Sequence, residues 1–390
     1  MEDKRENTTS YSRYLIWILC IAFLLCFVVA LLNYIVDPYF HYHKPYTNYR
    51  LADERYINDG IARNFDYDAI IIGNSLSENF KCSQYDALFD VKSVKLPYSG
   101  SGVKELWDAL GHMIGRKPLS EDAYNHIAET QPEYIDDYKA LDGYGKDIKE
   151  VLICVDIDDI DRYYSWHRYN EYPDYLYDDI WWNDINYLLN KDTLYRGTVY
   201  NLGMTIAGKE STSFDEYASW TRESGPKQAL GDLDYIDENI NGMDRSFEEK
   251  DAARVCYNIK CNVLPVIEAN PNVRFRFLVA PISIAKWAEY RSDGKTGYIV
   301  DVVKCFSDML LEYNNVEIYS FLDSYDVIND LDRYCDSIHY DAGVSEWMLD
   351  EISMGNHNVN TDNMMRYYDD LKAYLTSYDY VSLNDYLDSQ

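Results

Sequence analysis

The sequence has few basic residues for its length. Its 390 residues include 36 Lys and Arg against 67 Asp and Glu, which gives a formal net charge of −31. A surface of this sign repels a polyanion, so we expect no nucleic-acid partner. We find no internal repeat and no low-complexity linker, so the polar stretches described below are better interpreted as insertions than as independent domains.

Cysteines are present but lack the spacing of a metal site or a disulfide framework. Two of the eight lie in the first apolar run, and the other six are Cys82, Cys154, Cys256, Cys261, Cys305 and Cys335. Cys256 and Cys261 are five positions apart and have no histidine at zinc spacing, which disfavours metal and redox chemistry. We therefore expect no cofactor.

One weak metal candidate is a calcium loop. Asp237, Asn239, Asn241 and Glu248, with a glycine between the last two, have the spacing of oxygen ligands in an EF-hand. Arg245 stands at a ligand position, however, and no convincing helix precedes the loop. A turn followed by a capped helix is the alternative interpretation.

Charged side chains are absent from residues 15–36. This run, "LIWILCIAFLLCFVVALLNYIV", is long enough to span a bilayer as a helix. A cleaved signal peptide is the alternative, because residues 28–30 loosely resemble a cleavage site, although the apolar run continues past them. Basic residues are slightly more frequent before the run than after it, which favours an inside N-terminus. We expect a single-pass protein of the cell membrane with its large domain outside the cytoplasm.

Short apolar runs alternate with amphipathic ones in the remaining chain. Strands are predicted at residues 68–73, 91–96, 150–156, 273–280 and 316–321, and helices at 77–89, 103–114, 249–268 and 298–313. The alternation predicts an α/β fold of right-handed βαβ units with a mainly parallel sheet. Ligands of such sheets bind at the carboxyl ends of the strands.

The same patterns divide the chain. We expect a tail at 1–14, a transmembrane signal-anchor at 15–36, a juxtamembrane segment at 37–66, the α/β domain at 67–375 and a tail at 376–390. Residues 116–148 and 161–245 are acidic insertions that cap the strand ends. The aromatic run from Tyr163 to Trp182 could either stack on a glycan or anchor its insertion, and both interpretations stay open.

Ser75 lies between the first predicted strand and the first predicted helix, in "IIGNSLSENF". Two interpretations compete. The serine could cap the helix, because Ser75 and Glu78 have the spacing of a capping box. Alternatively its hydroxyl and N–H could face the cleft near a helix N-terminus, where developing negative charge is stabilised.

A base and an orienting carboxylate for a nucleophilic serine occur near the C-terminus. Asp336 and His339 lie in "YCDSIHYDAG", three residues apart and after the last predicted strand. One turn would let the carboxylate orient the imidazole while the other ring nitrogen reaches Ser75. A DxxH pair is common by chance in so acidic a chain. This pair gains weight from its position after the last predicted strand.

These stretches together resemble a known family. "IIIGNSLSENF", "LPYSGSGVKE" and "DSIHY" are similar to blocks I, II and V of the SGNH (GDSL-like) hydrolases, and more closely to their membrane-anchored, DltD-like and O-acyltransferase-associated bacterial members. "NPNVRFRFLVAPISIAKW" is also similar to a stretch of such proteins. The resemblance extends over roughly residues 35–375 and implies a three-layer α/β/α, flavodoxin-like domain.

The resemblance also implies roles for single residues. Ser75 would be the nucleophile, His339 the general base and acid, and Asp336 its orienting carboxylate. The oxyanion hole would use the N–H of Ser75 and that of Gly100, with Gly102 as the alternative glycine. Both glycines could instead form an ordinary strand-to-helix turn.

The chain departs from the family at block III. The third predicted strand ends in "VLICVDIDDIDR", which offers Asp156, Asp158 and Asp159 where the family has an asparagine that donates to the oxyanion. An ionised carboxylate cannot donate a hydrogen bond. Asp156 and Asp158 are therefore near-site candidates without an assigned role, as is Asn74 of "GNS". Either a residue elsewhere supplies the donor, or burial keeps the aspartate protonated, or hydrolysis is poor. The departure therefore puts free hydrolysis in doubt more than acyl transfer.

From this we expect a membrane-anchored serine O-acyl esterase or acyltransferase that acts on a cell-envelope glycan or another acylated polymer. The resemblance suggests a membrane-bound O-acyltransferase as a partner. A non-catalytic accessory protein that binds a glycan or that partner is the main alternative. A secreted carbohydrate esterase is a third, and it requires cleavage of the apolar segment.

Overall fold

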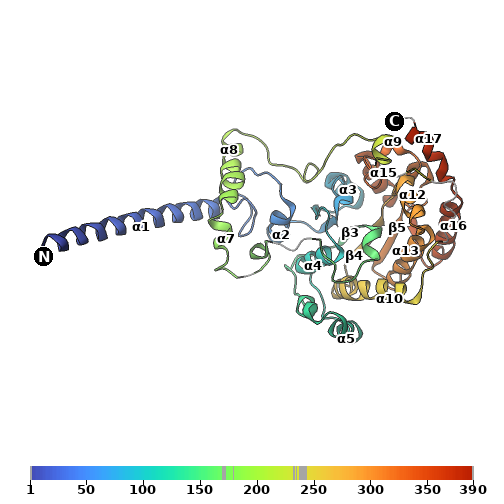
Figure 1. Ribbon diagram of the computed structural model, residues 1–390, viewed down its shortest axis with the longest axis horizontal. Coiled ribbons are helices and arrows are strands. Elements are labelled where there is room, and N and C mark those ends of the chain that lie inside the picture. Colours follow the sequence, from blue (N-terminus) through green and yellow to red (C-terminus); the bar gives the residue numbers. More distant parts are fainter. Residues whose placement is uncertain are drawn as a thin grey trace. The chain divides into compact units, whose positions relative to one another are not determined.

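Two units make up the chain, and they interleave along the sequence. Figure 1 shows the computed structural model, which describes residues 2–168, 173–178, 180–231, 233, 235–236 and 244–388. Unit 1 consists of Met1–Phe65 and Glu171–Ser213, and unit 2 of Asp66–Asn170 and Phe214–Gln390. The predicted insertion 161–245 is thus divided, because its central part folds with the N-terminal segment.

Unit 1 is built on one long helix. Its elements are α1 (Glu2–Val36), α2 (Glu54–Asn64), η3 (Asp174–Leu176), α7 (Ile185–Leu188), the π-helical turn η4 (Thr193–Val199) and α8 (Tyr200–Ile206). The Tyr11–Val36 part of α1 is long and apolar enough to cross a membrane. Both α7 and η4 pack against α1, and Figure 1 shows α7 and α8 on opposite sides of its C-terminal end.

Unit 2 is an α/β domain with a six-stranded sheet. The strands are β1 (Ala69–Gly73), β2 (Ser93–Pro97), β3 (Glu150–Val155), β4 (Arg274–Val279), β5 (Val316–Ser320) and β6 (Asn358–Val359). Their order is β2-β1-β3-β4-β5-β6, and only the short edge strand β6 is antiparallel to its neighbour. Because the other pairs are parallel, the carboxyl ends of β1, β2 and β3 meet at one edge of the sheet.

Helices cover the sheet on both faces. Every residue of β1, β2 and β3 is buried, as in a sheet that is covered on each side. The longer helices are α3 (Cys82–Phe89), α4 (Val103–Ile114), α5 (Glu121–Thr130), α10 (Glu249–Asn258), α12 (Ile284–Ser292), α13 (Thr296–Leu310), α15 (Ala342–Ser353) and α16 (Met364–Ser377). Shorter ones are α6 (Ile157–Ile160), α9 (Pro226–Ala229), α11 (Leu264–Ala269), α14 (Tyr325–Ile328) and α17 (Asn384–Asp388). The 3₁₀ segments are η1 (Ser75–Ser77), η2 (Pro132–Tyr138), η6 (Leu331–Arg333) and η7 (Tyr380–Leu383), and η5 (Ile259–Val263) is π-helical.

The five predicted strands all form, each within two residues of its expected bounds. The sequence did not reveal β6, because two residues give no periodic pattern. The helix predicted at 249–268 is interrupted, since α10 and α11 are joined by η5. Pro265, in the first turn of α11, has no N–H to donate to the preceding turn, which explains the break in the regular hydrogen bonding.

A buried ion pair joins the central strands β3 and β4. It lies toward the end of the sheet opposite to the carboxyl ends of β1, β2 and β3. Arg276 of β4 lies 2.6 Å from the Glu150 carboxylate of β3, and both side chains are almost fully buried. The guanidinium also donates to Glu317 (3.0 Å) and to the hydroxyl of Tyr85 (3.1 Å). A buried pair of this kind adds little net stability, but removing one partner leaves a buried charge uncompensated.

We predict that Arg276→Met lowers the free energy of unfolding by about 3–5 kcal/mol, because Glu150 is then left buried without its cation. Arg274→Met is the matched control on the same strand. Its side chain is 54% exposed and lies 3.7 Å from Glu150, so it should cost less than about 1 kcal/mol. Urea unfolding of the detergent-solubilised protein measures both, and equal losses would contradict the assignment.

Candidate active site

Ser75 begins a tight turn at the carboxyl end of β1. Asn74, and not Ser75, caps this turn, because the Asn74 Oδ1 accepts the N–H of Leu76 at 3.0 Å. The interpretation of Ser75 as a helix cap is therefore wrong. Gly73 allows the turn to approach β3, since a Cβ at this position would lie 2.8 Å from the Cβ of Cys154. The Ser75 hydroxyl is left for another partner.

That partner is His339. The Ser75 Oγ lies 2.7 Å from the His339 Nε2, and the His339 Nδ1 lies 2.7 Å from the Asp336 Oδ2 and 3.0 Å from its Oδ1. The three side chains thus form one continuous hydrogen-bonded chain. The tautomer with a proton on Nδ1 donates to the carboxylate and leaves Nε2 to accept the serine proton. The structure brings together the three residues that the sequence paired across 264 positions.

The loop that carries Asp336 and His339 is held against the serine turn. The buried hydroxyl of Tyr340 donates to the carbonyl of Leu76 at 3.0 Å, which ties the two chain segments together next to the triad. Within the loop, the N–H of Cys335 donates to the His339 carbonyl at 2.8 Å. The first contact holds the loop against the serine turn and the second holds the loop in shape, so together they fix the imidazole relative to Ser75. Tyr340 was not among the residues predicted from sequence.

Asp336 is held as a carboxylate. Burial alone would raise its pKa, but hydrogen bonds from the ring and the backbone N–H of His339 lower this pKa to about 2. The backbone N–H of Ile338 also donates to it at 2.9 Å. Arg222 adds a cation at 3.8 Å from the Asp336 Oδ2. Trp220 meets the His339 ring edge-on, with ring centroids 5.8 Å apart, and so covers part of the imidazole.

Asp156 faces the serine turn from the end of β3. Its Oδ2 accepts the side-chain N–H of Asn74 at 2.7 Å, and its Oδ1 accepts the N–H of Asp158 at 3.0 Å. Burial and then the neighbouring charge of Asp158 raise the pKa of Asp156, while these two hydrogen bonds oppose the rise. Both oxygens act as acceptors, so Asp156 orients Asn74 and is not placed as a donor to an oxyanion.

The next two aspartates point elsewhere. Asp158 accepts the hydroxyl of Tyr290 at 2.7 Å and lies 3.9 Å from the Lys286 ammonium. Asp159 lies 2.9 Å from the Arg162 guanidinium. Burial, followed by the charge of Asp156, raises the pKa of Asp159 to about 8. Asp158 was a near-site candidate from sequence, and its contacts with α12 give it a structural role.

The two candidate glycines differ in what their N–H groups do. Gly102 donates to the Glu105 Oε2 at 2.7 Å, which closes the first turn of α4. The N–H of Gly100 donates to no group in the described part of the chain, and its φ of +63° is the left-handed conformation that favours glycine. Of the two glycine N–H groups, that of Gly100 is the one left without an acceptor among the described residues.

A guanidinium lies against Gly100. A Cβ built on this glycine would be 2.6 Å from the Arg168 Nη1, so the cation covers the turn that follows β2. Trp166 covers Gly102 in the same way, at 2.3 Å from such a Cβ. The start of the aromatic insertion thus folds over the loop between β2 and α4. Sequence reasoning missed Arg168, because this insertion has no strand or helix pattern that would place it.

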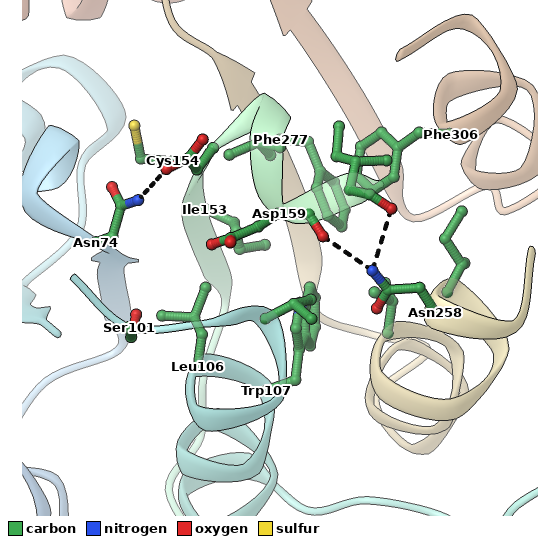
Figure 2. Close-up of a pocket in the computed structure, with 16 residues that line it drawn as sticks. Asn74, Ser101, Leu106, Trp107, Ile153, Cys154, Asp159, Asn258, Phe277 and Phe306 are labelled. Atoms are coloured by element: carbon green, nitrogen blue, oxygen red, sulfur yellow. Dashed lines mark hydrogen bonds between the residues drawn. The ribbon is translucent and has the colours of Figure 1, made fainter. Parts of the chain in front are cut away.

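A small apolar cavity lies beside the same strand ends (Figure 2). It has a volume of about 40 Å³ and is lined on most sides by Leu106, Trp107, Phe277 and neighbouring apolar side chains. Asn74 and Ser101, which adjoin Ser75 and Gly100 in the sequence, form part of its wall. A volume of this size holds a few water-sized groups.

The aromatic run from Tyr163 to Trp182 has no single role. Tyr164 is buried with Tyr138, Ile127 and Cys261, where it anchors residues of the 116–148 insertion. Trp181 and Trp182 belong to unit 1 and are exposed.

The calcium candidate can be followed only in part. Asp237, Asn239 and Asn241 lie outside the described residues. Glu248 is the N-cap of α10, where its N–H is bonded to the Asp251 carboxylate at 3.1 Å. Among the described residues, no group of three His, Cys, Asp or Glu side chains could hold a metal ion.

Comparison of the chain with protein-family models, with curated proteins and with solved structures gives no match. The assignment of a function therefore depends on the geometry of the site.

Proposed function

We propose that the protein is a membrane-anchored serine O-acyl esterase or acyltransferase of the SGNH type. It acts outside the cytoplasm on a cell-envelope glycan or a similar acylated polymer. The hydrogen-bonded chain from Ser75 through His339 to Asp336, at the carboxyl ends of parallel strands, is the observation that carries the proposal. A serine, a base and an orienting carboxylate in this order are the parts that nucleophilic acyl transfer requires.

In the proposed reaction, the Ser75 Oγ attacks the acyl carbonyl and the His339 Nε2 takes the serine proton. The N–H groups of Ser75 and Gly100 stabilise the oxyanion. The leaving alcohol receives the proton from His339, and an acyl-serine remains. Water or a sugar hydroxyl then attacks this ester, gives its proton to His339, and releases Ser75 with its own proton restored.

Arg168 offers a replacement for the missing block III asparagine. Its guanidinium lies against Gly100, so its positive charge is close to the turn that would hold the oxyanion. A cation stabilises developing negative charge without a proton rearrangement. The cavity beside Asn74 and Ser101 would accommodate a short acyl group. A membrane-bound O-acyltransferase, as suggested by the family resemblance, would supply or receive the acyl group.

A non-catalytic accessory protein is the second candidate, and one observation favours it. The two oxygens of the Asp156 carboxylate only accept hydrogen bonds. One of them binds the side chain of Asn74, the residue directly before Ser75. If ionised, the carboxylate would oppose an oxyanion at Ser75. The cleft would then bind an acylated glycan without turning it over.

Labelling by a fluorophosphonate probe tests whether Ser75 is activated. We expect the full-length protein in detergent to be labelled, because His339 removes the proton from the serine hydroxyl as phosphorus is attacked. Ser75→Ala and His339→Ala should both abolish labelling. Ser353→Ala, in α15 and exposed, should label like the wild type. An unlabelled but folded wild-type protein would favour the accessory protein.

A second test addresses the oxyanion hole. Gly100→Ala places a methyl group against the Arg168 guanidinium and strains a positive φ, so we expect turnover of an acetyl ester to fall by about 10²–10³-fold. Gly145→Ala is the matched control. Its φ is +65° and a Cβ there meets nothing within 4 Å, so it shares only the strain, about 1–2 kcal/mol of stability. Equal turnover by the two variants would remove Gly100 from the mechanism.

A further inference from the structure

Exposed apolar side chains gather in unit 1 near the C-terminal end of α1. We call Trp181, Trp182, Ile185, Tyr195, Val199 and Ile206 the aromatic collar. The exposed fractions of Trp181 and Ile206 are 81% and 87%. Single exposed apolar side chains are ordinary, but these six all lie between residues 181 and 206, in or next to the segments that pack against α1.

The segments that carry the collar are fastened to α1 at one level. Asn33 of α1 is fully buried, and its side-chain N–H donates to the carbonyl of Leu188, at the end of α7, at 2.9 Å. Its Oδ1 accepts the hydroxyl of Thr198, in η4, at 2.7 Å. One asparagine thus holds both halves of the collar.

A second set of contacts follows directly after α1. The Tyr187 hydroxyl donates to the Asp37 carboxylate at 2.8 Å and accepts the N–H of Tyr39. Gly197 of η4 lies against Pro38, since a Cβ there would be 2.6 Å from the proline ring. The collar therefore cannot slide along α1 without breaking buried hydrogen bonds.

The length of α1 gives the depth of this level in a bilayer. A charged side chain at Arg13 keeps that end of the helix out of the hydrocarbon. The roughly 30 Å of hydrocarbon is spanned by about 20 helical residues, so a span that starts at Tyr14 ends near Asn33. Asn33 is also the first strongly polar side chain after Arg13, and it lies near the C-terminal end of the apolar run. With the span placed in this way, Leu188 and Thr198, which bind Asn33, come to the boundary between hydrocarbon and headgroups.

We propose that the aromatic collar lies in the membrane–water interface and that the bilayer itself is its occupant. Tryptophan and tyrosine are enriched at this depth, where the ring is in an apolar layer and its polar atom can reach water. Unit 1 is then held against the membrane by two attachments, the spanning helix and the collar, so that it does not swing on α1 alone. This inference does not depend on the catalytic proposal.

Tryptophan quenching in vesicles without any other protein tests the depth. Full-length protein and the Trp181→Phe/Trp182→Phe variant are reconstituted into vesicles of phosphatidylcholine and phosphatidylglycerol. The difference between their emissions isolates the two collar tryptophans. We expect a phosphatidylcholine brominated near the headgroup to remove most of this difference emission, and aqueous acrylamide to remove little of it.

Trp287 provides the control, because it is fully buried in unit 2. The difference emission between wild type and Trp287→Phe should respond to neither quencher. A collar that binds a membrane protein instead of lipid would be water-exposed in these vesicles. Strong quenching of the collar difference by acrylamide, without quenching by the brominated lipid, would overturn the proposal. If the double variant is unfolded by circular dichroism, Trp181→Phe alone gives the same comparison.

Discussion

The site of unit 2 depends on the side chain of Asn74, which joins two parallel strands at their ends. Its Oδ1 caps the turn that begins with Ser75, and its Nδ2 is held by Asp156 at the end of β3. Because the cap is made by the preceding residue, the serine hydroxyl is released from local hydrogen bonding and can meet His339. The parallel register of β1 with β3 sets the distance over which this connection works.

Much of unit 2 could be predicted from local patterns. The strand runs are continuous and apolar because both faces of the sheet are covered, so they can be recognised in the sequence. Their positions then show that Ser75 and the Asp336–His339 pair each follow a strand. Other features depend on contacts between distant segments. Arg168, Trp220 and Tyr340 reach the site from loops or insertions without a periodic pattern, and no spacing in the sequence pairs them with Gly100, His339 or Leu76. The association of residues 171–213 with α1 is equally nonlocal.

The structure gives the first aspartate after β3 a physical role. The Asp156 carboxylate, at the end of β3, accepts a hydrogen bond from the side-chain amide of Asn74, directly before Ser75. Both oxygens of this carboxylate accept hydrogen bonds, and burial raises its pKa. The guanidinium of Arg168 lies against Gly100, in the turn that follows β2.

The most direct test of the account is a search for the acyl-serine itself. Full-length protein is incubated with an activated short-chain acyl ester, quenched in acid, digested and analysed by mass spectrometry. The account predicts one acyl group on the peptide that contains Ser75, and none on that peptide in the His339→Ala variant. A folded wild-type protein that turns over the ester while this serine remains unmodified, or that carries no acyl group at all, would contradict it.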